Sequence, residues 1–190
     1  MRNIGIALIF VISLTGCREG KYTDNRPAEQ ARFVSIVREW RDTVNAAENN
    51  EGLRRQLLEN GVDSVKAHIV DSLQLEFKAW EARVLDVAPD PAESDYIVAS
   101  FGMNLDAGPM TEKNRYQSVV FTSRTSESQP AYAELKTLRV GDIVRIDGQF
   151  KTVQKTINVD SYNDLSKSKN VLDNPEFRVE MGKVEKLTGF

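Results

Sequence analysis

Ser166 and Lys169 have the spacing of a serine nucleophile and the lysine that activates it. On a helix this spacing places the two side chains one turn apart, so the amine can take the hydroxyl proton. Here both residues lie in residues 160–175, a polar stretch rich in Ser, Asn and Lys. That composition indicates a loop, in which the spacing is a coincidence. We therefore expect no catalytic residue here.

The candidate metal ligands are equally incomplete. Asn104, Asp106 and Gly108 have the spacing of a calcium loop, but the later glutamate of such a loop is missing and Arg115 stands near its place. His68 is the only histidine and Cys17 the only cysteine, so the ligands of a zinc site are lacking. We expect no metal and no other cofactor, and we expect His68 to be a surface or boundary residue.

Composition argues against a nucleic-acid partner. The 190 residues carry a formal net charge of -3, which gives no general attraction to a polyanion. Four aromatic residues lie on two expected strands, where bases can stack, but lysine and arginine are sparse beside them: Tyr96, Phe101, Tyr116 and Phe121. We expect these rings mostly to fill a core.

The first 17 residues have the pattern of a secretion signal. Arg2 is followed by an apolar run, residues 4–14, which is too short to span a bilayer. The run ends in Leu14-Thr15-Gly16-Cys17, which resembles the lipobox of bacterial lipoproteins. The resemblance implies that residues 1–16 are removed and that the Cys17 thiol is diacylated. The alternative is an ordinary secretion signal followed by an incidental cysteine.

The resemblance also implies a cellular location. Two or three acyl chains anchor a protein stably in a membrane, facing the periplasm if the host is Gram-negative. Arg18 stands where an aspartate commonly retains enterobacterial lipoproteins in the inner membrane, so the outer membrane is favoured. Residues 17–26 are polar and are interpreted as a tether.

Residues 27–61 are predicted to be helical. An amphipathic helix over about 28–48 is expected to begin at Asp24 or Asn25 as cap, with Pro27 early; its stripe is Phe33, Val37, Trp40, Val44 and Ala47. A second short helix, around Leu53–Leu58, is expected to stop at Asn60-Gly61. The secondary structure of residues 62–70 is ambiguous, because the apolar spacing is helical but several residues are β-branched. The stripe favours packing on the protein's own barrel over a coiled coil with a second copy.

Residues 62–190 are predicted to form a barrel that folds alone when the chain begins near Asp71. The expected strands are 73–84, 96–101, 116–122, 143–150 and 176–187, with a helix after Pro130. A phase shift of the alternation after Ala79 predicts a β-bulge. Three strands, a helix and two strands are the order of the five-stranded OB-fold. The fold class is therefore α+β, a helical segment followed by an OB-like barrel.

The barrel part resembles the OB-type domains of small bacterial envelope proteins. The resemblance is carried by Trp80-Glu81-Ala82-Arg83-Val84, Tyr132, Leu135, Leu138, Gly141-Asp142-Ile143-Val144 and Gly148-Gln149-Phe150. At Gly141 or Gly148 we expect a positive φ or a place where a Cβ would collide. OB domains bind oligonucleotides, oligosaccharides or proteins, so the resemblance leaves function open.

We interpret the chain as a lipid-anchored envelope protein that binds or scaffolds a protein partner and is not an enzyme. The alternatives are a glycan-binding OB module and a small cell-wall hydrolase that uses a loop serine. OB ligands cross strands two and three between the loops that here are residues 88–94, acidic, and 160–175, basic. We expect Tyr162, Lys167 and Lys169 of the second loop to contact the partner.

Overall fold

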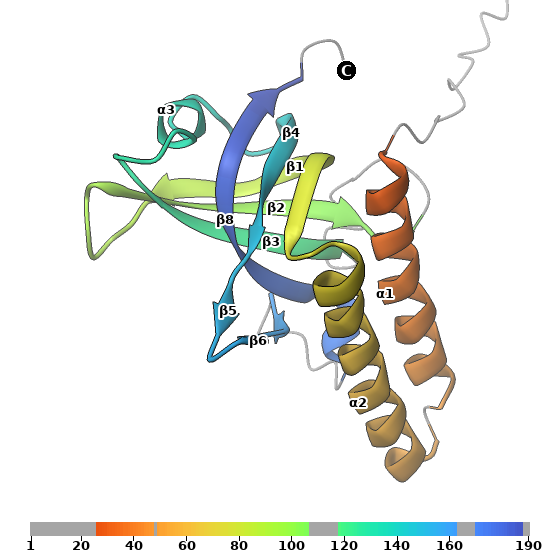
Figure 1. Cartoon of the computed structure of the whole chain (residues 1–190). Coiled ribbons are helices and arrows are strands. Elements are labelled where there is room, and N and C mark those ends of the chain that lie inside the picture. Colours follow the sequence, from red (N-terminus) through yellow and green to blue (C-terminus); the bar gives the residue numbers. More distant parts are fainter. Residues whose placement is uncertain (1–25, 48, 107–117, 163–169, 188–190) are drawn as a thin grey trace, which may run out of the picture.

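The computed structural model describes residues 26–47, 49–106, 118–162 and 170–187. A pair of helices leads into a barrel (Figure 1). The helices are α1 (Ala28–Ala46) and α2 (Glu51–Ala67), which continues as the π-helical turn η1 (His68–Ser72). The barrel strands are β1 (Glu76–Pro89), β2 (Tyr96–Asn104), β3 (Ser118–Ser126), β4 (Ile143–Phe150) and β8 (Pro175–Lys186). The short helix α3 (Tyr132–Leu135) lies between β3 and β4.

The strand pairing closes the barrel in the order β3-β2-β1-β4-β8. Every neighbouring pair is antiparallel except β3 and β8, whose parallel pairing completes the ring. After β4 come the small hairpin of β5 (Thr152–Val153) and β6 (Thr156–Ile157), then β7 (Asp160–Ser161) and the 3-10 turn η2 (Val171–Asp173). Five strands with a helix after the third confirm the predicted α+β fold with an OB-like barrel.

The bulge predicted in the first strand is present. The pairing of β1 with β4 shifts register between Phe77 and Trp80, and Ala79 has φ 56°. Asp147 Oδ1 accepts a hydrogen bond of 2.6 Å from the Ala79 N–H, which holds this strained residue in place. The bulge bends β1 so that its first half pairs with β4 and its second half with β2.

The strand ends differ from the sequence prediction. β1 begins at Glu76, because Gln74 and Leu75 turn the chain with φ of 52° and 66°, and it runs on to Pro89. β3 continues to Ser126, beyond the predicted strand end at residue 122. α3 is only 4 residues long. Pairing with β2 extends both strands, because hydrogen bonding to a neighbouring strand does not require an apolar side chain. In β3 the added Ser123 and Thr125 are polar and fully buried.

Both predicted glycine positions are confirmed. Gly141 has φ +95°, a conformation that side-chain-bearing residues rarely adopt. A Cβ on Gly148 would lie 2.4 Å from the Glu180 carbonyl oxygen and 2.7 Å from Phe77 Cζ. Gly148 is therefore the point where β1, β4 and β8 approach most closely in this part of the barrel.

The predicted end of the second helix at Asn60-Gly61 is wrong, because α2 continues to Ala67 and the chain stays helical to Ser72. Residues 62–70 are thus helical, and the boundary that we drew at residue 61 falls within a helix. A Cβ on Gly61 would lie 3.1 Å from both Leu172 Cδ1 and Trp40 Cβ. The glycine therefore serves the close approach of α1 and α2, which a local stop signal does not distinguish from a helix end. Asp24 and Asn25 lie outside the described residues.

Helix α1 packs on the protein's own barrel, as predicted. Phe33 is fully buried, and the centre of its ring lies 5.3 to 5.9 Å from those of Trp80, Phe150 and Phe177. Val37, Val65 and Ile69 belong to the same hydrophobic core as the barrel strands. The helices and the barrel therefore share one core.

The side-chain amide of Gln30 in α1 hydrogen-bonds to the backbone of the barrel strand β1. Its Nε2 donates to the Glu81 carbonyl oxygen, and its Oε1 accepts from the Glu81 N–H at 2.9 Å. Glu81 lies in β1 just before β2 begins to pair at Arg83. The side-chain amide thus takes the place of a strand at the corner of the barrel, and it is fully buried.

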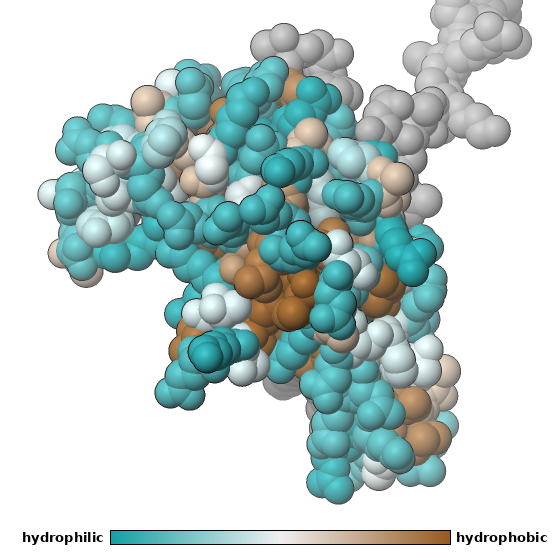
Figure 2. Space-filling model, viewed as in Figure 1, coloured by the Kyte–Doolittle hydropathy of each residue, from teal (hydrophilic) through white to brown (hydrophobic). Residues whose placement is uncertain are grey.

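Figure 2 shows a largely hydrophilic surface, with apolar side chains gathered where the helix pair meets the barrel. Four large apolar side chains of the described residues are clearly exposed: Leu53, Val70, Val140 and Val153. Within the described ranges no helix combines the length and apolar character needed to cross a membrane.

Candidate functional site

The two loops predicted to flank a ligand lie at opposite ends of β2 and β3. Tyr96 pairs with Ser126 at one end, next to residues 88–94. At the other end Ser118 Oγ contacts Asn174 Oδ1 at 3.3 Å, close to where β7 pairs with the start of β8. Because β2 has 9 residues, the two loops are separated by roughly 25–30 Å.

Of the three predicted contact residues, the structure describes only Tyr162. It is half-buried, and its N–H donates to the Asn174 carbonyl oxygen at 3.1 Å. Lys167 and Lys169 lie outside the described residues, as does Ser166. The role of these residues in partner binding stays a prediction.

The far side of that loop is attached to helix α1. Asn170 donates to Asn45 Oδ1 at 2.9 Å, and Asn45 donates to Asp173 Oδ1 at 2.9 Å. Leu172, between them, is fully buried against the helix pair. The helices therefore fix one end of the loop that carries the predicted contact residues.

Both carboxylates of the acidic loop pair with one cation of the protein. Arg124 of β3 forms ion pairs with Asp90 and, at 2.8 Å, with Glu93. The hydrogen bond from Arg124 lowers the pKa of Asp90 below its usual range. Because two carboxylates share this guanidinium, Arg124 offers little attraction to a polyanion.

An apolar hollow lies between the β1–β2 turn and α3, and we call it the tyrosine hollow. Its volume is about 340 Å³. Its lining residues are mostly apolar, with two tyrosines and one charged side chain: Val87, Ala88, Pro89, Ser94, Tyr96, Ile97, Tyr132, Leu135, Lys136 and Leu138. In Figure 1 the β1–β2 turn and α3 project from the same side of the barrel, away from the helix pair.

Cations fix the two tyrosine rings of the hollow. The Arg124 guanidinium lies 3.8 Å from the centre of the Tyr96 ring, and the Lys136 amine lies 5.5 Å from that of Tyr132. Such contacts contribute about 0.5–1 kcal/mol each when exposed. They orient the rings, so an apolar side chain can enter without first ordering the walls.

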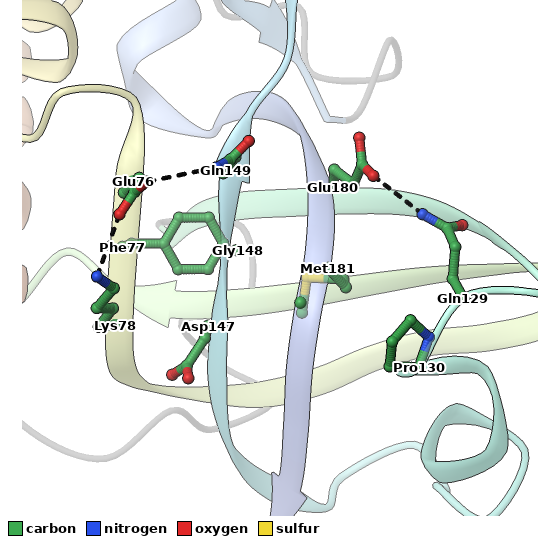
Figure 3. A pocket seen from close by; sticks show the side chains of 11 residues that line it. Glu76, Phe77, Lys78, Gln129, Pro130, Asp147, Gly148, Gln149, Glu180 and Met181 are labelled. Atoms are coloured by element: carbon green, nitrogen blue, oxygen red, sulfur yellow. Dashed lines mark hydrogen bonds and ion pairs between the residues drawn. The ribbon is translucent and has the colours of Figure 1, made fainter.

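A second hollow, of about 480 Å³, lies over β1, β4 and β8 and is shown in Figure 3. Gly148 and Gly182 are among its lining residues. Three carboxylates line it, Glu76, Asp147 and Glu180, and Figure 3 shows them set apart around the rim.

Each of these carboxylates already has a partner. Glu76 pairs with Lys78 at 3.2 Å, Asp147 accepts from Ala79, and Glu180 accepts from Gln129 at 3.2 Å.

The residues considered as metal ligands from the sequence contact other protein groups in the structure. Asp106 pairs with Arg41 at 3.2 Å, and its N–H donates to Asn104 Oδ1; Gly108 lies outside the described residues. His68 is half-buried at the boundary between α2 and the barrel, where its ring stacks on Phe33. Burial lowers the pKa of His68. In the described parts of the chain, no three His, Cys, Asp or Glu residues come close enough to hold a metal ion.

The aromatic residues divide between core and surface. Phe101 and Phe121 are fully buried, as expected, whereas Tyr96 is half-buried on the rim of the tyrosine hollow and Tyr116 lies outside the described residues. Sequence reasoning noted Tyr96 and Tyr132 separately but did not place them in one site. The spacing of Tyr132 and Lys136, one helical turn apart, was the local signal available.

Comparison of the chain with protein-family models, with curated proteins and with solved structures finds no match.

Proposed function

We propose that the protein is a lipid-anchored module of the bacterial cell envelope that binds a protein partner. The single observation that carries the binding role is the tyrosine hollow, an apolar concavity with two oriented aromatic rings and one lining cation. Concave apolar sites with a few polar groups are where proteins accept ligands. The anchor is supported by the signal-like residues 1–16 and by Cys17 at the end of the lipobox-like sequence.

A protein partner suits the hollow better than a polyanion or a glycan does. Arg124 is the only cation on the described residues of β2 and β3, and Asp90 and Glu93 pair with it. Its guanidinium also occupies one face of the Tyr96 ring, so that face is not available for stacking by a sugar or base. An apolar side chain of a protein requires only the apolar walls.

Replacing Tyr132 with alanine is expected to reduce capture of the partner at least about tenfold, because aromatic residues in such hollows commonly dominate binding energy. The measurement is crosslinking followed by purification of the tagged protein from membranes, with quantification of the captured protein. Circular dichroism checks that the variant keeps its fold.

A matched variant tests the other end of β2 and β3. Alanine replacement of Tyr162, Lys167 and Lys169 together leaves the hollow intact. If this triple variant loses the partner while Tyr132→Ala captures it at the wild-type yield, the loop of residues 160–175 is the binding surface and the hollow is not. Capture at the wild-type yield by both variants would refute both surfaces.

The anchor has its own test. Cys17→Ser is expected to move the protein from the membrane fraction to the soluble fraction and to abolish incorporation of labelled palmitate, because the serine hydroxyl cannot be acylated in its place. Arg18→Ser, which leaves the cysteine in position, is the control and should remain in the membrane fraction. Acyl labelling of the Cys17→Ser variant at the wild-type level would contradict the proposal.

A further inference from the structure

The last part of β1 is an open strand edge beside the tyrosine hollow. β1 pairs with β4 only as far as Arg83, and the Val84 backbone completes that contact with Gly141 and Asp142. Beyond this point, residues 86–89 pair with β2 on one side. Among the described residues, no strand pairs with their other side.

The hydrogen-bonding pattern shows which backbone groups face that open edge. The Asp90 N–H donates to the Tyr96 carbonyl oxygen, so Asp90 and Tyr96 are a hydrogen-bonded pair. In an antiparallel pair, hydrogen-bonded positions alternate with positions that are not hydrogen-bonded. The backbone N–H and C=O of Ala88 therefore also point toward β2, whereas the backbone groups of Val87 and Pro89 point toward the open edge. Proline fits the outward position because it has no N–H to donate. The edge therefore presents the N–H and C=O of Val87 and the C=O of Pro89.

The edge and the hollow are continuous, because Val87, Ala88 and Pro89 line both. Backbone groups in this arrangement are satisfied by an extended chain, whose alternate side chains then point to the same face. On that face Ile97, Leu135 and Leu138 form a base that is almost fully buried in the protein. The half-buried lining residues that a partner side chain can reach are Val87, Tyr96 and Tyr132. Pro89 removes one donor, so affinity depends on side chains in the hollow as well as on the backbone.

Charge identifies the segment further. Lys136 is the one charged residue that lines the hollow, and it is exposed. An amine beside an apolar wall complements a carboxylate next to an apolar side chain. A basic segment would place a like charge against Lys136 in the hollow, although Asp86 at the other end of the edge would attract it.

We propose that an extended segment of the partner protein adds to β1 as a further strand at residues 86–89, with apolar side chains in the tyrosine hollow and a carboxylate beside Lys136. This inference rests on the proposed protein-binding function and specifies how the partner is held.

The test uses the mature protein and a synthetic eight-residue peptide of alternating valine and serine that ends in glutamate. Two further peptides carry N-methyl groups, one on every valine amide and one on every serine amide. Because a paired strand uses the N–H of alternate residues only, one methylated peptide is expected to bind about tenfold more weakly, ~1.4 kcal/mol, and the other to bind nearly as well as the parent. The parent should also slow hydrogen exchange of the Val87 amide and leave that of Ala88 unchanged.

A charge swap completes the experiment. A peptide that ends in lysine, with an amidated terminus, is expected to bind more weakly than the glutamate peptide with the same amidated terminus, and Lys136→Glu should reverse that order. Three results would overturn the added strand. They are equal binding of the parent and both methylated peptides, an equal loss of affinity for both methylated peptides, and no binding of any peptide. The protein-binding function fails separately, if Tyr132→Ala and the triple variant both capture the partner at the wild-type yield.

Discussion

Replacement of Phe33 with alanine is expected to destabilise the entire protein by about 3–5 kcal/mol, the cost of truncating a buried phenylalanine. Phe33 comes from α1, yet its ring lies among Trp80, Phe150 and Phe177 of the barrel and is fully buried. The alanine would leave a cavity at the contact between the helix and the strands. Thermal or urea unfolding of the mature protein measures the loss.

Arg32→Ala is the matched control, because Arg32 is exposed on the same helix and its replacement removes no side chain from the core. We expect a change within about 0.5 kcal/mol. A similar small change for Phe33→Ala would mean that α1 does not complete the barrel core. That a chain beginning near Asp71 folds alone stays a prediction, and such a chain would lack both Phe33 and Gln30.

Replacement of Gly148 with valine is expected to cost about 3 kcal/mol or more, at the upper end of the range for overpacked cores. The new Cβ would lie 2.4 Å from the Glu180 carbonyl oxygen, a backbone atom that cannot rotate away. Relief requires β4 and β8 to separate where Gly148 pairs with Met181, and it also displaces Phe77. Chemical denaturation of the variant gives the free energy of unfolding.

Gly182→Ala provides the comparison within the same hollow. Its Cβ would meet the Asp147 carbonyl oxygen at 3.6 Å, an ordinary van der Waals contact. We expect a change of less than about 1 kcal/mol, since the loss of chain freedom in the unfolded state offsets part of any strain. Equal stability of the Gly148→Val and Gly182→Ala proteins would show that the close approach of β4 and β8 is not a constraint.

The elements that the sequence predicted correctly are those with a local signature. The phase shift after Ala79 predicted the bulge in β1, because side chains of a strand alternate between two faces and an extra residue interrupts the alternation. Gly141 and Gly148 marked a positive φ and a close contact, both of which exclude a side chain. The order of strands and helix then sufficed for the OB-like arrangement.

The errors arose where a local signature had a distant cause. Asn60-Gly61 has the sequence of a helix end, but Gly61 is small because Trp40 and Leu172 pack against it. The apolar alternation stops at Val84, where the predicted strand ends, yet β2 extends β1 to Pro89 by pairing with it. Neither partner is close in sequence to the residues that it affects.

The sequence by itself determined the OB-like order of elements, the bulge and the two constrained glycines, since each follows from the periodicity or the backbone freedom of neighbouring residues. Only the tertiary structure decided that Phe33 and Gln30 of the helix complete the barrel, and that Tyr96, Tyr132 and Lys136 border one hollow beside an open strand edge. These arrangements join residues separated by tens of positions. Their positions relative to one another depend on how the whole barrel closes, because no local pattern sets the distance between them.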